Sequence, residues 1–95
     1  MRIDGIIWLE ATVETLASKH HVSTDEVEEV LGTQPRFRFI ERGHRPGESV
    51  YAAFGRTQGG RRLLVFFIHK PRTHEALILS AREPSRAERR LYEKE

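Results

Sequence analysis

The sequence contains no cysteine. This absence excludes disulfide bonds, thiolate metal sites and cysteine nucleophiles, and it fits the reducing cytoplasm, where we expect the protein to reside. Long hydrophobic runs are also absent, because the longest is LLVFFI at Leu63–Ile68. A membrane-spanning helix needs about 20 apolar residues, so we expect a core strand here and no membrane partner. Asp4 and Glu10 interrupt the N-terminal segment, so no signal peptide is expected.

Several motifs of common enzyme chemistry are missing as well. The chain has no glycine-rich phosphate loop and no serine-centred nucleophile elbow. Its five histidines do not have the spacing of zinc ligands. Nucleotide-driven and acyl-transfer reactions are therefore not expected, and we expect neither a metal nor a cofactor.

The amino acids that are present describe a small globular protein with an uneven distribution of charge. Its 95 residues suffice for one domain, which we assign to residues 1–95, with 38% hydrophobic and 32% charged residues. The net charge is only +2, but STDEVEEV is acidic while the ranges 36–62 and 82–90 are rich in arginine. Such a basic region can bind a polyanion locally. The alternative is that these arginines are scattered and solvated.

Hydrophobic spacing predicts a short strand at Ile3–Trp8 and two helices after it. The first helix would end near KHHV, and its buried face would consist of Leu9, Val13, Leu16, Ala17 and His20. Ser23 and Glu26 form a capping-box pattern that predicts the start of the second helix. This helix would bury Val27, Val30 and Leu31 and end at Gly32 in a left-handed conformation.

After Pro35 the period changes to two, which indicates strands. Four are predicted, in RFRFIE, SVYAAFGRT, RRLLVFFIHK and EALILSAR. The third is apolar on both faces and should be central in the sheet. SRAE repeats the capping-box pattern and starts a terminal helix, for which we expect Ala87 and Leu91 as the buried stripe. The order β-α-α-β-β-β-β-α predicts an α+β fold with a small, mostly antiparallel sheet, two N-terminal helices and one C-terminal helix.

Arg82 is the first candidate for an anion-binding side chain. Strand alternation predicts that Ile78, Ser80 and Arg82 share a face, and Arg82 directly precedes a helix N-terminus. A guanidinium beside free helix amides suits an anion. On the helix, Arg86 and Arg90 are four residues apart and repel each other unless an anion lies between them. Alternatively, Arg82 pairs with Glu83 or Glu93 and only fixes the helix, while the helical arginines are solvated.

Other residues have two interpretations each. Lys19 and His20 end the first predicted helix and can neutralise a phosphate or accept a proton, yet His20 also continues the apolar stripe. His69 reaches either a cleft or solvent, and it shares the central strand with Arg62 at the strand's start. Phe37 and Phe39 of RFRF form either a base-stacking platform or part of the core.

The chain resembles the BrnT-like toxins, small ribonucleases of type II toxin–antitoxin systems with a RelE-like fold. The resemblance covers nearly the whole chain. Its most specific part is SAR…ERR.YE at Ser80–Glu93, and KH.V at Lys19, His20 and Val22 follows in specificity. STDEVEEVL and the GRTQGGRRLLVFF hairpin extend it.

The resemblance implies a metal-independent endoribonuclease that inhibits translation, silenced by a ribbon-helix-helix antitoxin. It implies catalytic roles for Lys19, His20, Arg82 and Tyr92. From the resemblance and the charge pattern together we expect Arg62, Arg86, Arg89 and Arg90 to bind RNA.

The N-terminal region departs from the pattern of this family. BrnT-like chains commonly have Asp, Lys, Asn and Gly where this chain has Leu9, Thr12, Leu16 and His21. These replacements support a second hypothesis, a non-catalytic toxin-fold module that binds a partner protein or RNA. A plain structural domain is a third. The sequence leaves open whether two copies associate as a homodimer.

Overall fold

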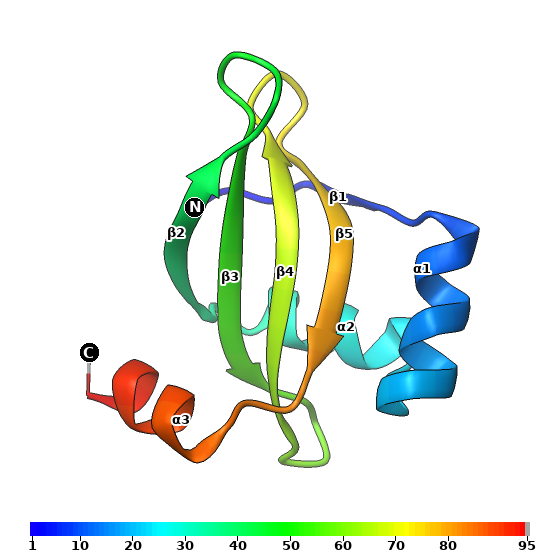
Figure 1. The fold of residues 1–95 in the computed structure, drawn as a ribbon, viewed down its shortest axis with the longest axis vertical. Helices are drawn as coiled ribbons and strands as arrows, with labels where there is room; N and C mark the ends of the chain where they lie inside the picture. The colour runs from blue at the N-terminus through cyan, green and yellow to red at the C-terminus, as the bar shows by residue number, and fades with distance from the viewer. Residues whose placement is uncertain (95) are drawn as a thin grey trace.

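A five-stranded mixed sheet forms the centre of the fold (Figure 1). The structure is a computed structural model, and it describes residues 1–94. The strands are β1 (Gly5–Ile7), β2 (Arg36–Arg42), β3 (Ser49–Arg56), β4 (Arg62–Lys70) and β5 (Glu75–Arg82). Their spatial order is β1-β5-β4-β3-β2, with β1 parallel to β5 and the other neighbours antiparallel. The predicted α+β class and the central position of β4 are confirmed.

The helices occur where the sequence predicts them. They are α1 (Glu10–Thr15), a turn of π-helix η1 (Leu16–His20), α2 (Thr24–Gly32) and α3 (Arg86–Glu93). Both capping boxes are present, with Ser23 and Glu26 at α2 and Ser85 and Glu88 at α3. Each box satisfies backbone amides that a helix start leaves without partners, so these short sequences define where the helices begin.

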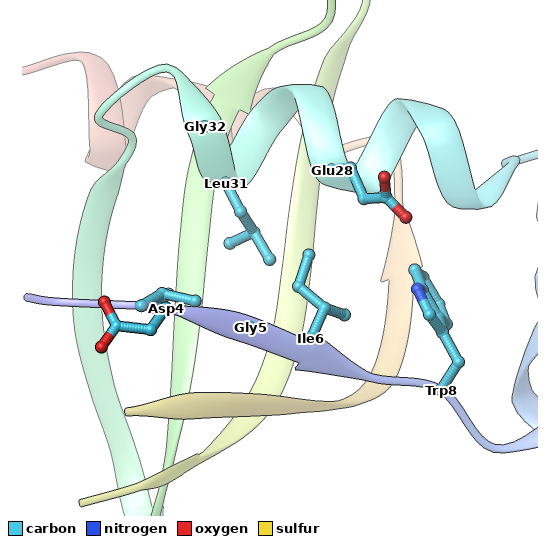
Figure 2. Close-up of a pocket in the computed structure, with 8 residues that line it drawn as sticks. Asp4, Gly5, Ile6, Trp8, Glu28, Leu31 and Gly32 are labelled. Carbon is cyan, nitrogen blue, oxygen red and sulfur yellow. The ribbon is translucent and has the colours of Figure 1, made fainter. Parts of the chain in front are cut away.

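The N-terminal helices cover one face of the sheet, which we call the helix face (Figure 1). Leu16 of η1 and Val27 and Val30 of α2 are fully buried there. They pack against alternate residues of the strands, namely Ala53, Leu63, Val65, Phe67, Ala76, Ile78 and Ala81. A groove remains open between α2 and β1 at the margin of this core (Figure 2).

The opposite face of the sheet carries α3, and we call it the α3 face. A smaller cluster of Ala52, Phe54, Leu64 and Tyr92 lies here, with Phe66 at its margin. Figure 1 shows α3 at one end of the sheet, away from the turn between β4 and β5. Within the described chain, no other helix packs on this face, so much of it remains accessible.

The predicted alternation in β5 is wrong at one point. The register pairs Phe66 with Ser80 but Phe67 with Ile78, so Leu79 is an extra residue in a β-bulge. Ile78 and Ala81 both belong to the core on the helix face. Ile78 therefore does not share a face with Ser80 and Arg82, which point toward α3.

Two details of the N-terminal helices also differ from prediction. Ala17 is exposed, because the helix ends in a π-turn that changes the angular spacing along its last residues. Leu9 is also exposed, and it lies before the helix as the extended N-cap residue of α1. Gly32 lies inside α2 and does not have a positive φ. The left-handed residue after this helix is Gln34, with a φ of 54°.

The face by which α3 contacts the sheet is polar and aromatic, so the predicted stripe is wrong. Ala87 and Leu91 are exposed, and Leu91 keeps 48% of its accessible surface. Glu88 and Tyr92 face the sheet in their place. The reason is the sheet surface beneath α3, where arginines and Phe54 favour a carboxylate and an aromatic ring over aliphatic groups.

Candidate nucleic-acid interface

Arg82 makes a two-pronged ion pair with Glu88 of α3. Its Nη1 and Nη2 donate to Oε1 and Oε2 of Glu88 at 2.7 and 2.8 Å, and Nη1 also donates to the Glu83 carbonyl at 3.3 Å. The guanidinium lies over the Phe66 ring at 5.4 Å. Arg82, followed by the capping amide of Ser85, lowers the pKa of Glu88 to about 2. The fixing role for Arg82 is therefore present, with Glu88 as the partner instead of Glu83 or Glu93.

Three further strand arginines contact the C-terminal half of α3. Arg36 Nη1 donates to the Tyr92 carbonyl at 2.6 Å, and the Arg38 guanidinium lies 5.7 Å from the centroid of the Tyr92 ring. Arg62 Nε is 3.7 Å from a Glu93 carboxylate oxygen. Together with Arg82, these side chains come from strands β2, β4 and β5 and fix α3 on the sheet.

The four arginines predicted to bind RNA are brought together around α3. They are Arg62, Arg86, Arg89 and Arg90, and we call them the arginine surface. Arg86, Arg89 and Arg90 are exposed and line a shallow hollow of about 400 Å³. Arg62 and Arg89 line a second hollow of about 210 Å³ together with Arg61, Glu83 and Pro84. Arg89 belongs to both hollows, so the two form a continuous basic surface.

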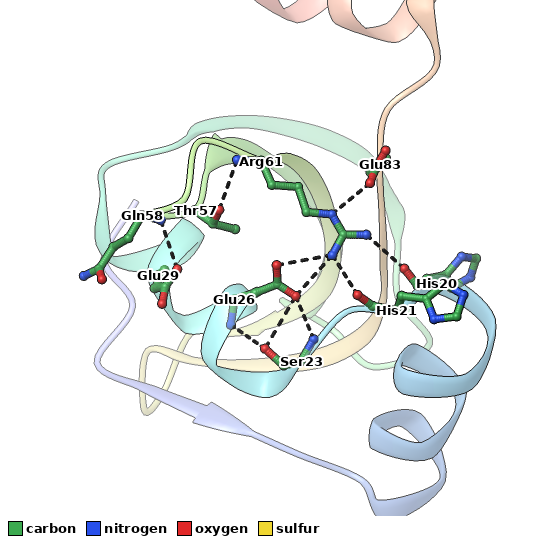
Figure 3. A network of polar contacts seen from close by, with 9 residues as sticks. All are labelled: His20, His21, Ser23, Glu26, Glu29, Thr57, Gln58, Arg61 and Glu83. Carbon is green, nitrogen blue, oxygen red and sulfur yellow. Dashed lines mark hydrogen bonds and ion pairs between the residues drawn. The ribbon is translucent and has the colours of Figure 1, made fainter.

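Arg61 connects this surface to the helices on the other face of the sheet (Figure 3). Its Nε donates to Glu83 at 2.8 Å, and Nη1 lies 3.2 Å from both carboxylate oxygens of Glu26. Nη1 and Nη2 also donate to the carbonyls of His21 and His20 at 2.7 and 3.0 Å. The pKa of Glu26 is lowered, first by the Ser23 backbone amide and then by Arg61.

The sequence did not single out Arg61. Its neighbour Arg62 stands out because it lies at the entrance of the apolar central strand, whereas Arg61, the first residue of the predicted strand RRLLVFFIHK, shows no pattern of its own. The carboxylates that Arg61 pairs with, Glu26 in the first turn of α2 and Glu83 before α3, are 35 and 22 residues away in the sequence, so no local pattern indicates these pairs. Only the fold shows that the Arg61 guanidinium reaches both carboxylates and the two histidine carbonyls.

Lys19 and His20 lie at the end of η1, beyond Arg61. Lys19 is exposed and His20 is half-buried. Figure 3 shows the carbonyls of His20 and His21 directed toward Arg61 and their rings directed away from it. The Arg61 guanidinium thus lies between the Lys19–His20 segment and Glu83. Glu83 in turn lines the hollow together with Arg62 and Arg89.

Tyr92, the remaining predicted catalytic residue, is a packing residue in this conformation. Its side chain keeps 4% of its accessible surface and stacks on Phe54, with ring centroids 5.4 Å apart and planes inclined by 22°. Its ring therefore faces the sheet. Tyr92 can orient α3, and so the arginines that α3 carries.

The other aromatic and histidine candidates lie away from the arginine surface. His69 packs between Tyr51 and His74, with its Nε2 3.1 Å from the Arg2 carbonyl. Phe37 packs edge-on against Phe67 in the core, whereas Phe39 is 55% exposed. Phe37 therefore fits the interpretation as a core residue. Of the two rings, only that of Phe39 is exposed and accessible for stacking.

Neither a metal cluster nor a membrane span is found in residues 1–94. No group of three or more histidine and carboxylate side chains there could hold a metal ion. None of the helices in the same range is long and apolar enough to cross a membrane. The chemical groups that the interface offers are guanidinium groups, an imidazole, an amine and exposed aromatic surface.

Comparison with known proteins adds no family to this description. No model of a protein family matches the sequence, and no curated protein matches it.

Proposed function

We propose that the protein binds single-stranded RNA at the arginine surface and cleaves it without a metal ion, as the toxin of a type II toxin–antitoxin system. The observation that carries this proposal is the hollow shared by Arg62 of β4 and Arg89 of α3. Two guanidinium groups from different elements converge on one small concavity. This arrangement suits a phosphate, because planar guanidinium groups donate paired hydrogen bonds to phosphate oxygens.

The surroundings of the hollow favour a single strand over a duplex. Next to α3 the sheet is uncovered, and Phe66 lies half-buried there beneath Arg82. Unpaired bases can stack on an aromatic ring or a guanidinium plane, while the bases of a duplex are already stacked on one another. Cleavage by an internal hydroxyl also requires RNA, because only RNA has a 2′-hydroxyl.

The proposed reaction is an in-line attack of the 2′ oxygen on the adjacent phosphorus. The new 2′ O–P bond forms as the bond from phosphorus to the 5′ oxygen breaks, which leaves a 2′,3′-cyclic phosphate. Arg62 and Arg89 stabilise the charge that develops on the phosphate. Water accepts the proton of the 2′-hydroxyl and returns one to the departing 5′ oxygen, which leaves as a hydroxyl. His20 and Lys19 lie beyond Glu83 and Arg61, so they would contact the next nucleotides of a strand that extends from the hollow toward η1.

Arg82 and Tyr92 receive positioning roles in this proposal. Both terminal nitrogens of Arg82 donate to Glu88 at 2.7 and 2.8 Å, whereas Arg62 and Arg89 approach Glu93 through Nε, at 3.7 and 3.4 Å. The phosphate contact is therefore assigned to the terminal nitrogens of Arg62 and Arg89. Arg82 and Tyr92 fix α3 on the sheet, and α3 carries Arg86, Arg89 and Arg90. Arg86 and Arg90 would bind the flanking phosphates.

A backbone feature at His21 supports the family resemblance behind this proposal. His21 has a φ of 54°, in the left-handed region that favours glycine. BrnT-like chains commonly have glycine at this position of their KHGV pattern. The local geometry thus agrees with the alignment of KHHV to that pattern. The family resemblance, in turn, is the source of the proposal of a cytoplasmic toxin silenced by a ribbon-helix-helix antitoxin.

Two observations favour a second candidate, a toxin-fold module that binds RNA or a partner protein without cleavage. The Arg82 side chain is fully engaged by Glu88, and the first helix has Leu9, Thr12 and Leu16 where the related pattern is polar. This candidate shares the arginine surface with the first. The two differ only in whether bound RNA is cut.

RNA binding is tested by the salt dependence of affinity for a labelled oligouridylate. Each phosphate contact contributes about 0.7 to the log–log slope for a single strand, so Arg62→Ala and Arg89→Ala should each reduce the slope by about that amount. Fluorescence anisotropy between about 50 and 200 mM salt measures it. Arg72→Ala is the matched control, because Arg72 is exposed in the turn between β4 and β5. Equal slopes for all three variants would refute binding at this surface.

A further inference from the structure

The groove between β1 and α2 lies on the helix face, outside the arginine surface (Figure 2). It has a volume of about 400 Å³. Its lining comes from two short segments, Ile3–Trp8 without Ile7, and Glu28, Leu31 and Gly32 of α2. No basic side chain is among the lining residues, so the groove and the arginine surface have opposite electrostatic character.

The floor of the groove is apolar and partly accessible. Ile3, Ile6 and Leu31 pack against the main core but are not fully buried. Figure 2 shows Leu31 and Ile6 directed into the space between α2 and β1. An aliphatic side chain placed there would remove apolar surface of both partners from water, which favours binding.

Glu28 supplies the negative charge at the margin of the groove. It is exposed, and it makes no hydrogen bond or ion pair within residues 1–94. Asp4, the other lining carboxylate, is paired with Arg2 at 2.9 Å. Asp25, one turn before Glu28 on α2, is also exposed. The charge that a ligand meets here is therefore negative and uncompensated at Glu28.

Trp8 contributes a hydrogen-bond donor without an acceptor. Its Nε1 is buried and has no partner within the described chain. Figure 2 shows the indole rising from the end of β1 toward Glu28. Buried polar groups are usually satisfied, and a buried donor without an acceptor is unfavourable. Because this nitrogen is buried, a ligand carbonyl becomes its acceptor only when binding turns the ring so that the N–H faces the groove.

We propose that this groove binds a basic segment of a partner polypeptide. An aliphatic side chain of the segment lies on Ile6 and Leu31, and a neighbouring lysine or arginine pairs with Glu28. A main-chain carbonyl accepts from Trp8 Nε1. The inference does not depend on the RNA proposal, because none of its residues belongs to the arginine surface.

Two other occupants fit the groove less well. RNA is repelled by Glu28 and Asp25 and finds no cation among the lining residues. A second copy would have to offer its own basic segment, α3, which the strand arginines hold on the sheet.

The single tryptophan makes the test direct, because Trp8 is the only one in the chain. The indole N–H of the uniformly ¹⁵N-labelled protein gives one resonance. The probes are two capped peptides, one alternating leucine with lysine and arginine, and one with glutamate at the basic positions. We expect the basic peptide to shift the Trp8 resonance saturably, and the acidic peptide to leave it unchanged.

Two variants locate the charge that binds the peptide. Glu28→Gln should weaken binding about threefold to fivefold, the range of a partly exposed ion pair. Glu14→Gln removes an equal charge from α1, outside the groove, and should leave the affinity unchanged. Their spectra without peptide establish that both variants are folded.

Three results would overturn the proposal. The first is a Trp8 resonance that no concentration of basic peptide moves, and the second is equal affinity for the wild type and Glu28→Gln. The third is a Trp8 shift that depends on protein concentration in the absence of peptide, since a second copy would then occupy the groove. RNA binding at the arginine surface is measured separately, so its failure would not imitate any of these.

Discussion

At the scale of single residues, Arg82 makes the kind of contact that the alternative interpretation of the sequence predicted, an ion pair that fixes the helix, but with a different partner. Its position between a strand end and a helix start indicated an ionic role, and the structure contains one. The partner is Glu88, which simultaneously caps α3 through the Ser85 amide at 2.8 Å. Sequence distance alone could not separate Glu88 from Glu83 and Glu93, because each is within reach of a long arginine side chain.

This pair predicts a pH dependence of stability. The pKa of Glu88 is about 2 in the folded protein, below its usual 4.5. A lowered folded pKa stabilises the fold above the unfolded pKa, and that contribution is lost as the pH falls from about 4.5 toward 2. Urea denaturation should therefore show the free energy of unfolding of the wild type falling more steeply in this range than that of Glu88→Gln. Glu14→Gln is the control and should follow the wild type.

Glu88→Gln should also be less stable than the wild type at neutral pH, by about 1 kcal/mol, because the ion pair is only partly buried. If the free energy of unfolding fell in parallel with pH in Glu88→Gln and the wild type, the Arg82–Glu88 pair would not contribute to the stability of the fold.

At the scale of elements, local signals predicted the structure well and long-range ones did not. The capping boxes of α2 and α3 depend on residues three apart in the chain, and both are present. The bulge at Leu79 depends on how β5 pairs with β4, which the alternation of one strand does not contain. The π-turn at Leu16–His20 similarly reflects the packing of Leu16 and the carbonyls held by Arg61.

The end of η1 provides a prediction at this scale. His21 is exposed and left-handed, with its amide donating to the Leu16 carbonyl. A left-handed conformation costs a residue with a side chain about 1–2 kcal/mol, and glycine avoids this cost but loses more chain entropy on folding. His21→Gly should therefore stabilise the protein by about 0.5–1 kcal/mol, which thermal unfolding would show as a melting temperature a few degrees higher.

Lys19→Gly is the matched comparison for this change. Lys19 is exposed on the same element but helical, so glycine there should destabilise by up to about 1 kcal/mol. Loss of stability in both variants would mean that His21 makes a stabilising contact that outweighs its backbone strain.

At the scale of the whole molecule, the sheet separates two surfaces of opposite charge. The face with α3 carries the arginine surface, and the helix face carries the exposed carboxylates of α2 around the groove. This separation explains how a chain of net charge +2 can offer a strongly basic site. The clustering of arginine near the C-terminus predicted the arginine surface. The groove could not be predicted in this way, because it forms only when β1 pairs with β5 beside α2, and no local pattern indicates that pairing.

The central claim is cleavage of RNA at the arginine surface, and one measurement tests it most directly. A long unstructured RNA is incubated with the protein in excess chelator, and the product ends are analysed. We predict 2′,3′-cyclic phosphate ends from the wild type and from Arg72→Ala. The double variant Arg62→Ala/Arg89→Ala should be slower by about 10²-fold or more, the usual cost of losing a preorganised donor. Intact RNA with the wild-type protein, both free and in a translating-ribosome assay, would contradict the claim.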